Sequence, residues 1–107
     1  MVKKDFEEKP GGRDVTYAFE SLDYPAVERH VNGYYAEFCA VAADKVRLHQ
    51  HPGGEFIFVL GGTLCVQIGA DEHTLEPRDS MYFDSSIPHG YRRSGAKSCT
   101  AIVVTTP

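Results

Sequence analysis

Two histidines and a glutamate lie close together in the stretch HQHPGGEF, residues 49–56. Side chains alternate along a strand, so His49 and His51 would project from the same face. The Pro-Gly-Gly turn at residues 52–54 would return the chain and bring Glu55 in from the adjoining strand. Two imidazoles and a carboxylate that converge inside a barrel are suitable ligands for a divalent transition metal.

A third imidazole would complete a set of four ligands, and His89 is the best candidate because it opens a later β segment directly after Pro88. Burial of imidazoles and a carboxylate without a shared cation is costly, which favours a metal site. The alternatives are a polar pocket wall that binds no metal and an outer face. The ligands do not select a reaction, and no second acid–base pair stands out, so the catalytic residues stay unassigned.

Three further side chains are candidates for contact with a small-molecule ligand. Arg47 shares strand parity with the two neighbouring histidines and could grip a substrate carboxylate. Its alternative is a solvated charge at a strand end. Tyr82 and Tyr91 flank His89 in sequence, and an inward-facing tyrosine could hydrogen-bond a ligand. The alternative for the tyrosines is packing within the barrel.

These residues lie among short runs of β-formers separated by turn residues. No segment combines a sustained apolar period of 3.6 residues with helix caps. Many short strands at close spacing predict an all-β sandwich or small barrel. We expect strands at residues 15–19, 34–42, 46–51, 55–60, 63–69, 73–75, 80–83, 89–93 and 99–105.

The chain of 107 residues is long enough for one domain with one hydrophobic core. Residues 1–14 are charged and contain a Pro-Gly-Gly sequence, so we interpret them as a flexible N-terminal arm, with a strand-forming arm as the alternative. Residues 15–107 are then a single barrel domain.

Composition restricts the binding partners and the cellular compartment that we expect for this protein. The net charge is −4, with 15 acids against 11 bases, which argues against direct binding of nucleic acid. The three cysteines are odd in number and widely spaced, as expected for reduced thiols in a cytosol. The N-terminus lacks the apolar segment of a signal peptide, and no apolar run approaches membrane-spanning length. We therefore expect a cytoplasmic protein that does not enter a membrane.

Two predicted strands are apolar on both faces, at residues 55–60 and 101–105. A strand with one face in water should instead alternate. Such strands lie either centrally between two layers or beneath a partner chain, and the second option predicts a homodimer.

The stretch HQHPGGEFIFVLGG resembles the first motif of the cupin superfamily, G(X)5HXH(X)3–4E(X)6G. His49, His51, Glu55 and Gly62 match the motif, and Ala43 stands in place of its leading glycine. The resemblance covers about residues 34–105.

The stretch LEPRDSMYFDSSIPH, residues 75–89, resembles a variant of the second cupin motif, whose usual form is L-x-P-G-D-S-x-x-F-D-S-x-x-P-H. This variant is frequent in the sensor half of regulators that join a helix-turn-helix domain to a cupin barrel. Arg78 stands where a glycine usually makes the turn after Pro77. If that turn needs a positive φ, Arg78 is strained; otherwise the turn type differs.

The resemblance implies a double-stranded β-helix, a jelly-roll-like barrel that is often dimeric. It also implies that His49, His51, Glu55 and His89 bind Fe, Mn, Ni, Co or Zn, with two coordination positions left to water, O₂ or a bidentate substrate. Three functions follow as hypotheses. The first is a metal-dependent oxygenase, isomerase or cyclase, the second a ligand-sensing domain without catalysis, and the third a structural module with incidental histidines.

Overall fold

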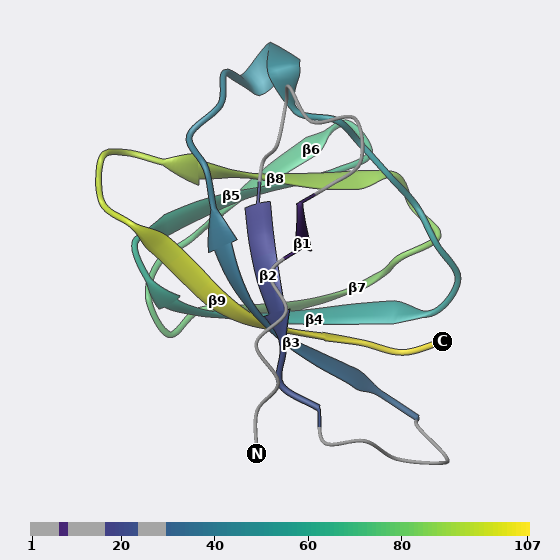
Figure 1. Cartoon of the computed structure of the whole chain (residues 1–107). Helices are drawn as coiled ribbons and strands as arrows, with labels where there is room; N and C mark the ends of the chain where they lie inside the picture. Colours follow the sequence, from purple (N-terminus) through teal and green to yellow (C-terminus); the bar gives the residue numbers. More distant parts are fainter. Residues whose placement is uncertain (1–6, 9–16, 24–29) are drawn as a thin grey trace.

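The computed structural model describes residues 7–8, 17–23 and 30–107. This part of the chain is built of strands, with one short 3-10 helix, η1, at Ala43–Lys45 (Figure 1). Within it, no helix is long and apolar enough to cross a membrane. The strands are β1 (Glu7–Glu8), β2 (Tyr17–Ser21), β3 (Asn32–Phe38), β4 (Gly54–Gly61), β5 (Thr63–Ile68), β6 (Asp71–Leu75), β7 (Ser80–Asp84), β8 (His89–Ser94) and β9 (Cys99–Thr105).

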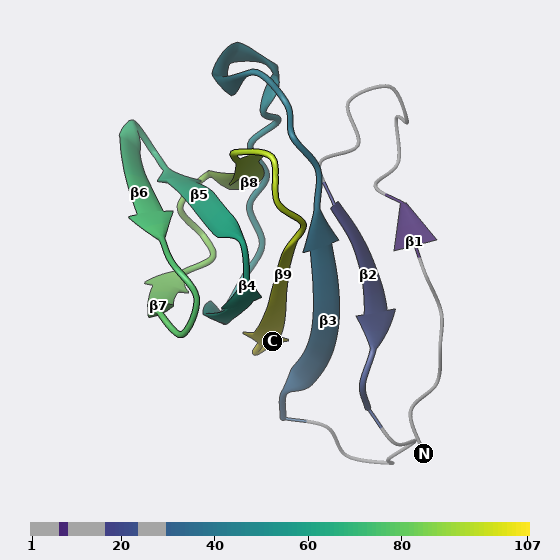
Figure 2. The ribbon, with the colours of Figure 1, turned by 90° about the vertical axis from the view of Figure 1, so that its left-hand side faces the viewer.

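The strands form two antiparallel sheets. One has the order β1-β2-β3-β9-β4-β7 and the other the order β6-β5-β8. In Figure 2, β6 and β5 lie on the left and β8 lies above β4, while β9, β3, β2 and β1 follow in order towards the right. The expected all-β architecture is therefore confirmed, and the interior between the two layers is where a site can be enclosed.

The core lies between the layers because alternate residues of each strand point inward. In β4 the inward side chains include Ile57 and Val59, and in β5 they include Leu64 and Val66, all fully buried. The sequence left open which face of β5 is internal. Leu64 and Val66 face the core between the layers, so Cys65 points to the other face of the sheet, where it is nevertheless only 5% exposed. The thiol of Cys65 lies there 3.4 Å from a carboxylate oxygen of Glu72.

The outer face of β4 shows whether both apolar faces of this strand are buried within the chain. Phe56 and Leu60 alternate with the core residues and remain 37% and 45% exposed. The described part of the chain thus buries one face of β4 and leaves the other partly open to solvent. Within the described residues, burial between two layers does not account for the apolar pattern on both faces of β4.

One expected strand does not form, and two residues of the expected N-terminal arm are described. The strand expected at residues 46–51 is wrong, because only one isolated bridge, between His49 and His89, forms there. Glu7–Glu8 of the expected arm form β1, which pairs with β2. The rest of that arm, and residues 24–29, lie outside the described residues.

Arg78 occupies a turn that requires a positive φ, which is one of the two possibilities that the motif left open. Its φ is 75°. The amide of Asp79 donates to the carbonyl of Glu76 at 2.9 Å, which closes a four-residue turn with Pro77 and Arg78 at its centre. Proline at the second position and a positive φ at the third identify a type II turn, in which glycine is preferred where Arg78 stands.

Candidate metal centre

Main-chain hydrogen bonds place the histidine segment against β8. The amide of His49 donates to the carbonyl of His89, and the amide of His89 donates to the carbonyl of His49, both at 2.9 Å. The amide of His51 donates to the carbonyl of Ser85 at 2.9 Å. Residues directly opposite in an antiparallel pair project from the same face. The rings of His49 and His89 accordingly lie with centroids 4.4 Å apart.

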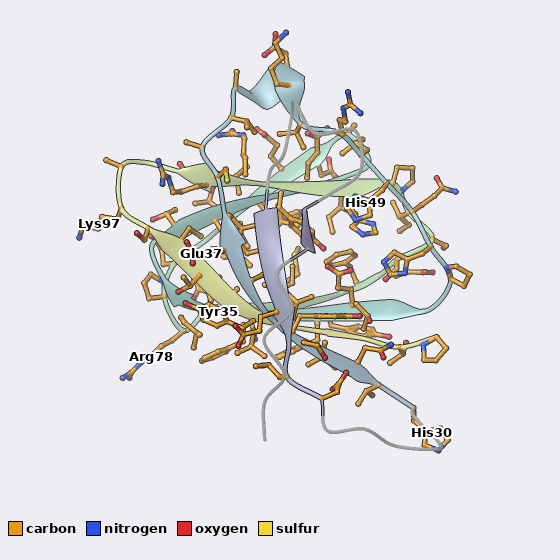
Figure 3. All side chains as sticks on the ribbon, in the orientation of Figure 1. His30, Tyr35, Glu37, His49, Arg78 and Lys97 are labelled. Carbon is orange, nitrogen blue, oxygen red and sulfur yellow. The ribbon has the colours of Figure 1, made fainter. Side chains whose placement is uncertain are left out.

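The three imidazoles converge in the interior of the barrel. One ring nitrogen of each of His49, His51 and His89 lies within 4.8 Å of the others. His89 is fully buried, whereas the side chain of His51 is 35% exposed. Figure 3 shows the labelled His49 pointing into the space between the layers.

Glu55 reaches the same place from the other sheet. The chain turns at Gly53, whose φ of 95° favours glycine. The next two residues begin β4 and direct the Glu55 side chain inward, where it is 3% exposed. Its Oε1 lies 3.3 Å from Nε2 of His51 and 3.6 Å from Nε2 of His89. The four side chains singled out in the sequence are thus neighbours in space.

The hydrogen bonds of two imidazoles determine which ring nitrogen faces Glu55. Nδ1 of His89 lies 2.8 Å from the carbonyl oxygen of Ile87, and Nδ1 of His51 lies 3.1 Å from that of Pro52. A carbonyl oxygen only accepts, so each Nδ1 carries the proton. In the neutral imidazoles, Nε2 then has a lone pair, and both lone pairs face the carboxylate oxygen of Glu55.

Three electron-pair donors therefore converge in a buried place, an arrangement that needs a cation or a shared proton between them. Imidazole nitrogen and carboxylate oxygen are a common donor set for divalent transition metals. A backbone carbonyl that holds the second nitrogen of a ligating histidine is a recurrent feature of such sites. The residues present thus fit the metal that the sequence motif implies.

The loop before His89 is held by its own side chains. Oδ1 of Asp84 accepts from the amide of Ser86 at 3.0 Å and from its hydroxyl at 2.8 Å. These hydrogen bonds lower the pKa of Asp84. The carbonyl of Pro88 accepts from the amide of Gly69 at 2.7 Å. The loop that delivers His89 is thereby tied to the end of β5.

A cavity of about 310 Å³ is lined by three of the four side chains, His49, His51 and Glu55. Sequence reasoning missed most of its walls. The inward residues of β3 could have been found from their alternation, since Tyr34, Ala36 and Phe38 occupy every second position. The lining residues are Tyr34, Ala36, Phe38, His49, His51, Glu55, Tyr91, Val103 and Thr105.

The structure treats the three candidate ligand-contact residues differently. Tyr91 lines the cavity and is 4% exposed. Tyr82 is 66% exposed on the outer face of β7, because Met81 and Phe83 take the inward positions. Arg47 is exposed and is not part of the lining. It precedes His49 outside a regular strand, so the alternation assumed for it does not extend that far.

Comparison with known proteins defines the class. The sequence model of the cupin domain matches residues 38–105, most of the chain. The chain belongs to the cupin family, and its two sheets are the jelly-roll-like barrel that the motifs imply. No curated protein is recognisably similar to it in sequence.

Three solved structures illustrate the likeness of the fold. The structure of FeII HppE is 21% identical in sequence to this chain and has a TM-score of 0.81. The match covers 95% of this chain and 55% of the HppE chain. Hydroxypropylphosphonic acid epoxidase from S. wedmorenis is 19% identical and has a TM-score of 0.79. This match covers 98% of this chain and 58% of the epoxidase chain. An HTH_3 family transcriptional regulator from Vibrio cholerae is 17% identical and has a TM-score of 0.71. This match covers 94% of this chain and 56% of the regulator chain. The chain spans a little over half the length of each of these structures.

Proposed function

We propose that this cupin binds one divalent transition metal through His49, His51, Glu55 and His89, and binds or acts on a small molecule in the adjoining cavity. The observation that carries the proposal is the pair of Nε2 lone pairs, from His51 and His89, directed at one buried carboxylate oxygen of Glu55. A divalent ion among these atoms would satisfy all of them at once.

Two uses of such a site are compatible with its geometry. When bound, iron would supply oxygen chemistry, and Zn, Mn, Ni or Co would supply Lewis-acid chemistry for an isomerase or cyclase. The chain itself would hold the ion, exclude bulk water with the core around His89, and present the Tyr91 hydroxyl to a ligand. The similarity of the fold to that of the iron-containing HppE structure supports the oxygenase hypothesis.

The alternative use is sensing of a small metabolite without catalysis. The stretch LEPRDSMYFDSSIPH, residues 75–89, supports it through its resemblance to the sensor half of cupin regulators. The fold of the HTH_3 family transcriptional regulator from Vibrio cholerae adds to that support.

The proposal extends to the setting of the protein. We place residues 15–107 in one barrel domain and the chain in the cytoplasm, where its three free cysteines would stay reduced. We further propose a homodimer formed through the outer face of β4 and its neighbours, because Phe56, Leu60 and Tyr82 are exposed there. Contiguous apolar surface of this kind marks association sites.

Elemental analysis tests the metal site. Protein purified without affinity nickel, then reconstituted with Fe²⁺, Co²⁺ or Zn²⁺ and desalted, should retain about one ion per chain. His51→Ala should abolish stoichiometric retention, whereas His73→Ala, on the exposed strand β6, should leave it intact. An empty wild-type protein after reconstitution would overturn the proposal.

The same preparations separate catalysis from sensing. An enzyme loaded with its metal should consume O₂ or convert a small-molecule ligand over many turnovers. A sensor should bind the ligand in a stoichiometric amount, release it unchanged, and shift its melting temperature.

A further inference from the structure

We infer that the cavity takes a small ligand that carries one negative charge at its metal-binding end and an uncharged, largely apolar body. This inference rests on the proposed metal site. It concerns the walls of the cavity, which no motif in the sequence assigns to a ligand class.

The walls divide into two parts. Polar ligand atoms of His49, His51 and Glu55 lie at one part of the cavity. Another part of the wall is formed by β3 and β9, whose buried side chains include Ala36, Phe38 and Val103. A ligand bound at the first part must therefore lay its remaining atoms against apolar side chains, which favours an aliphatic or aromatic body.

Charge restricts the ligand further. Among the described residues that line the cavity, Glu55 carries the sole formal charge, and neither lysine nor arginine is present. A divalent ion beside one carboxylate and neutral imidazoles leaves one positive charge in excess. One anionic group on the ligand neutralises that excess. A second anionic group would enter a wall without a cation to pair with it, which is costly.

Three hydroxyl-bearing residues complete the lining, and each of them can donate or accept a hydrogen bond. Thr105 lies directly opposite Glu55 in the register of β9 and β4, so it borders the metal-binding part. Tyr34 lies opposite Val103 on the neighbouring strand. Tyr91 follows His89 by two positions on the same face of β8. These hydroxyls can hydrogen-bond carbonyl, hydroxyl or amide atoms of a neutral ligand body, and none of them supplies the positive charge that a phosphonate or a second carboxylate would need.

The size of the cavity sets an upper limit on the ligand. At about 310 Å³ it lies at the small end of ligand-binding pockets. A single ring or a short branched chain beyond the chelating group fills it, and a nucleotide or a polycyclic compound does not.

Two matched probes test the inference on protein reconstituted with Co²⁺ or Zn²⁺. The compounds 4-carbamoylbenzohydroxamate and 4-carboxybenzohydroxamate share a monoanionic chelating end and a nearly identical shape. They differ in the charge of the distal group. Isothermal titration calorimetry should show the carbamoyl compound binding at least about tenfold more tightly than the carboxy compound, since the latter brings an unpaired anion to the apolar wall.

A pair of lysine variants extends the test to the wall itself. Val103→Lys would place a cation in the cavity and should remove the preference for the carbamoyl probe. Thr74→Lys adds the same charge on the exposed strand β6, away from the cavity lining and from the proposed dimer face, and should leave the preference intact. Should Val103→Lys fail to fold, the ratio measured on the wild-type protein still decides.

The outcomes distinguish this inference from the metal assignment. Protein that binds metal but prefers the carboxy probe, binds both equally, or binds neither would overturn the inference and leave the metal site standing. Protein that retains no metal would overturn the proposed function, and this inference with it.

Discussion

His49 and His89 are joined by a reciprocal pair of main-chain hydrogen bonds, each 2.9 Å long. This pairing holds the first and the last candidate ligand opposite each other, with ring centroids 4.4 Å apart. Their separation is fixed by backbone rather than by a flexible side-chain contact. Side chains held on paired backbone lose little freedom when they bind an ion, and such preorganisation favours tight binding.

Glu55→Gln should separate the stability of the metal-free protein from its affinity for metal. The change removes a buried negative charge, so we expect the metal-free variant to unfold at no lower a urea concentration than the wild type. Its affinity for Zn²⁺ or Co²⁺ should fall at least about 100-fold, since a charged ligand is lost. At metal 100-fold above Kd, the wild type should gain about 2.7 kcal/mol. Equal gain by the variant would contradict the role of Glu55.

Arg78→Gly should stabilise the fold. Arg78 has a φ of 75°, which costs an ordinary residue about 1 kcal/mol, and Figure 3 shows its side chain pointing away from the barrel. We expect the free energy of unfolding to rise by about 1 kcal/mol, and the melting temperature by roughly 4–8 °C. Arg78→Ala is the control and should give no gain, because alanine meets the same backbone penalty.

Gly62→Ala and Gly95→Ala should separate steric collision from backbone strain. Both glycines have positive φ, at 75° and 90°. A Cβ at Gly62 would collide with the main chain of Ser98 and Cys99, whereas one at Gly95 would meet nothing within 4 Å. We expect a loss of about 1 kcal/mol at Gly95 and at least about 2 kcal/mol more at Gly62. Equal losses in urea unfolding would refute the collision.

The stability of the protein should fall in alkaline solution, in part through Cys99. Burial raises the pKa of this thiol from 9.0 to about 11. The unfolded chain then ionises at Cys99 while the folded chain stays protonated, so the free energy of unfolding decreases as pH rises from 9 towards 11. Between pH 8 and 10 this contribution is about 1 kcal/mol.

Cys99→Ala provides the comparison for this pH dependence. The variant should show a shallower decline between pH 8 and 10 in urea unfolding, whatever its stability at pH 8. A decline as steep as that of the wild type would assign the alkaline sensitivity to other groups.

Leu60→Glu should dissociate the proposed homodimer. Leu60 is 45% exposed on the outer face of β4, and a carboxylate there would be buried without a partner at an apolar interface. Sedimentation should show a dimer for the wild type and a monomer for the variant, with metal retention unchanged. Ala96→Glu, which adds the same charge at an exposed position of the β8–β9 connection, should remain dimeric. A monomeric wild type would disprove the interface.

Much of the fold and the four converging side chains could be predicted from the sequence. Alternation and turn residues locate most strands, because both follow from local backbone geometry. The Pro-Gly-Gly turn between His51 and Glu55 predicts that these two side chains approach each other, whereas the strand alternation assumed for His49 and His51 does not form. The glycine of the motif raised a strained turn at Arg78 as one possibility, and the φ of 75° at this residue decides for it.

The walls of the cavity were harder to predict, because they depend on which strands lie side by side. Thr105 becomes part of the site through its pairing with β4, a contact between distant parts of the chain that local patterns do not encode. The prediction that Arg47 contacts a ligand assumed too much regularity in the backbone. Its parity with His49 presumed a regular strand, and the segment forms one bridge instead.

Glu55 and His89 approach each other from different sheets, β4 in the six-stranded layer and β8 in the three-stranded one. An ion shared between them would fasten one layer to the other, much as a disulfide fastens two strands. Metal binding would then be part of the scaffold as well as of the chemistry. Chelators should therefore lower the stability of the end of the barrel that holds this site. The supply of metal should influence the lifetime of the folded protein.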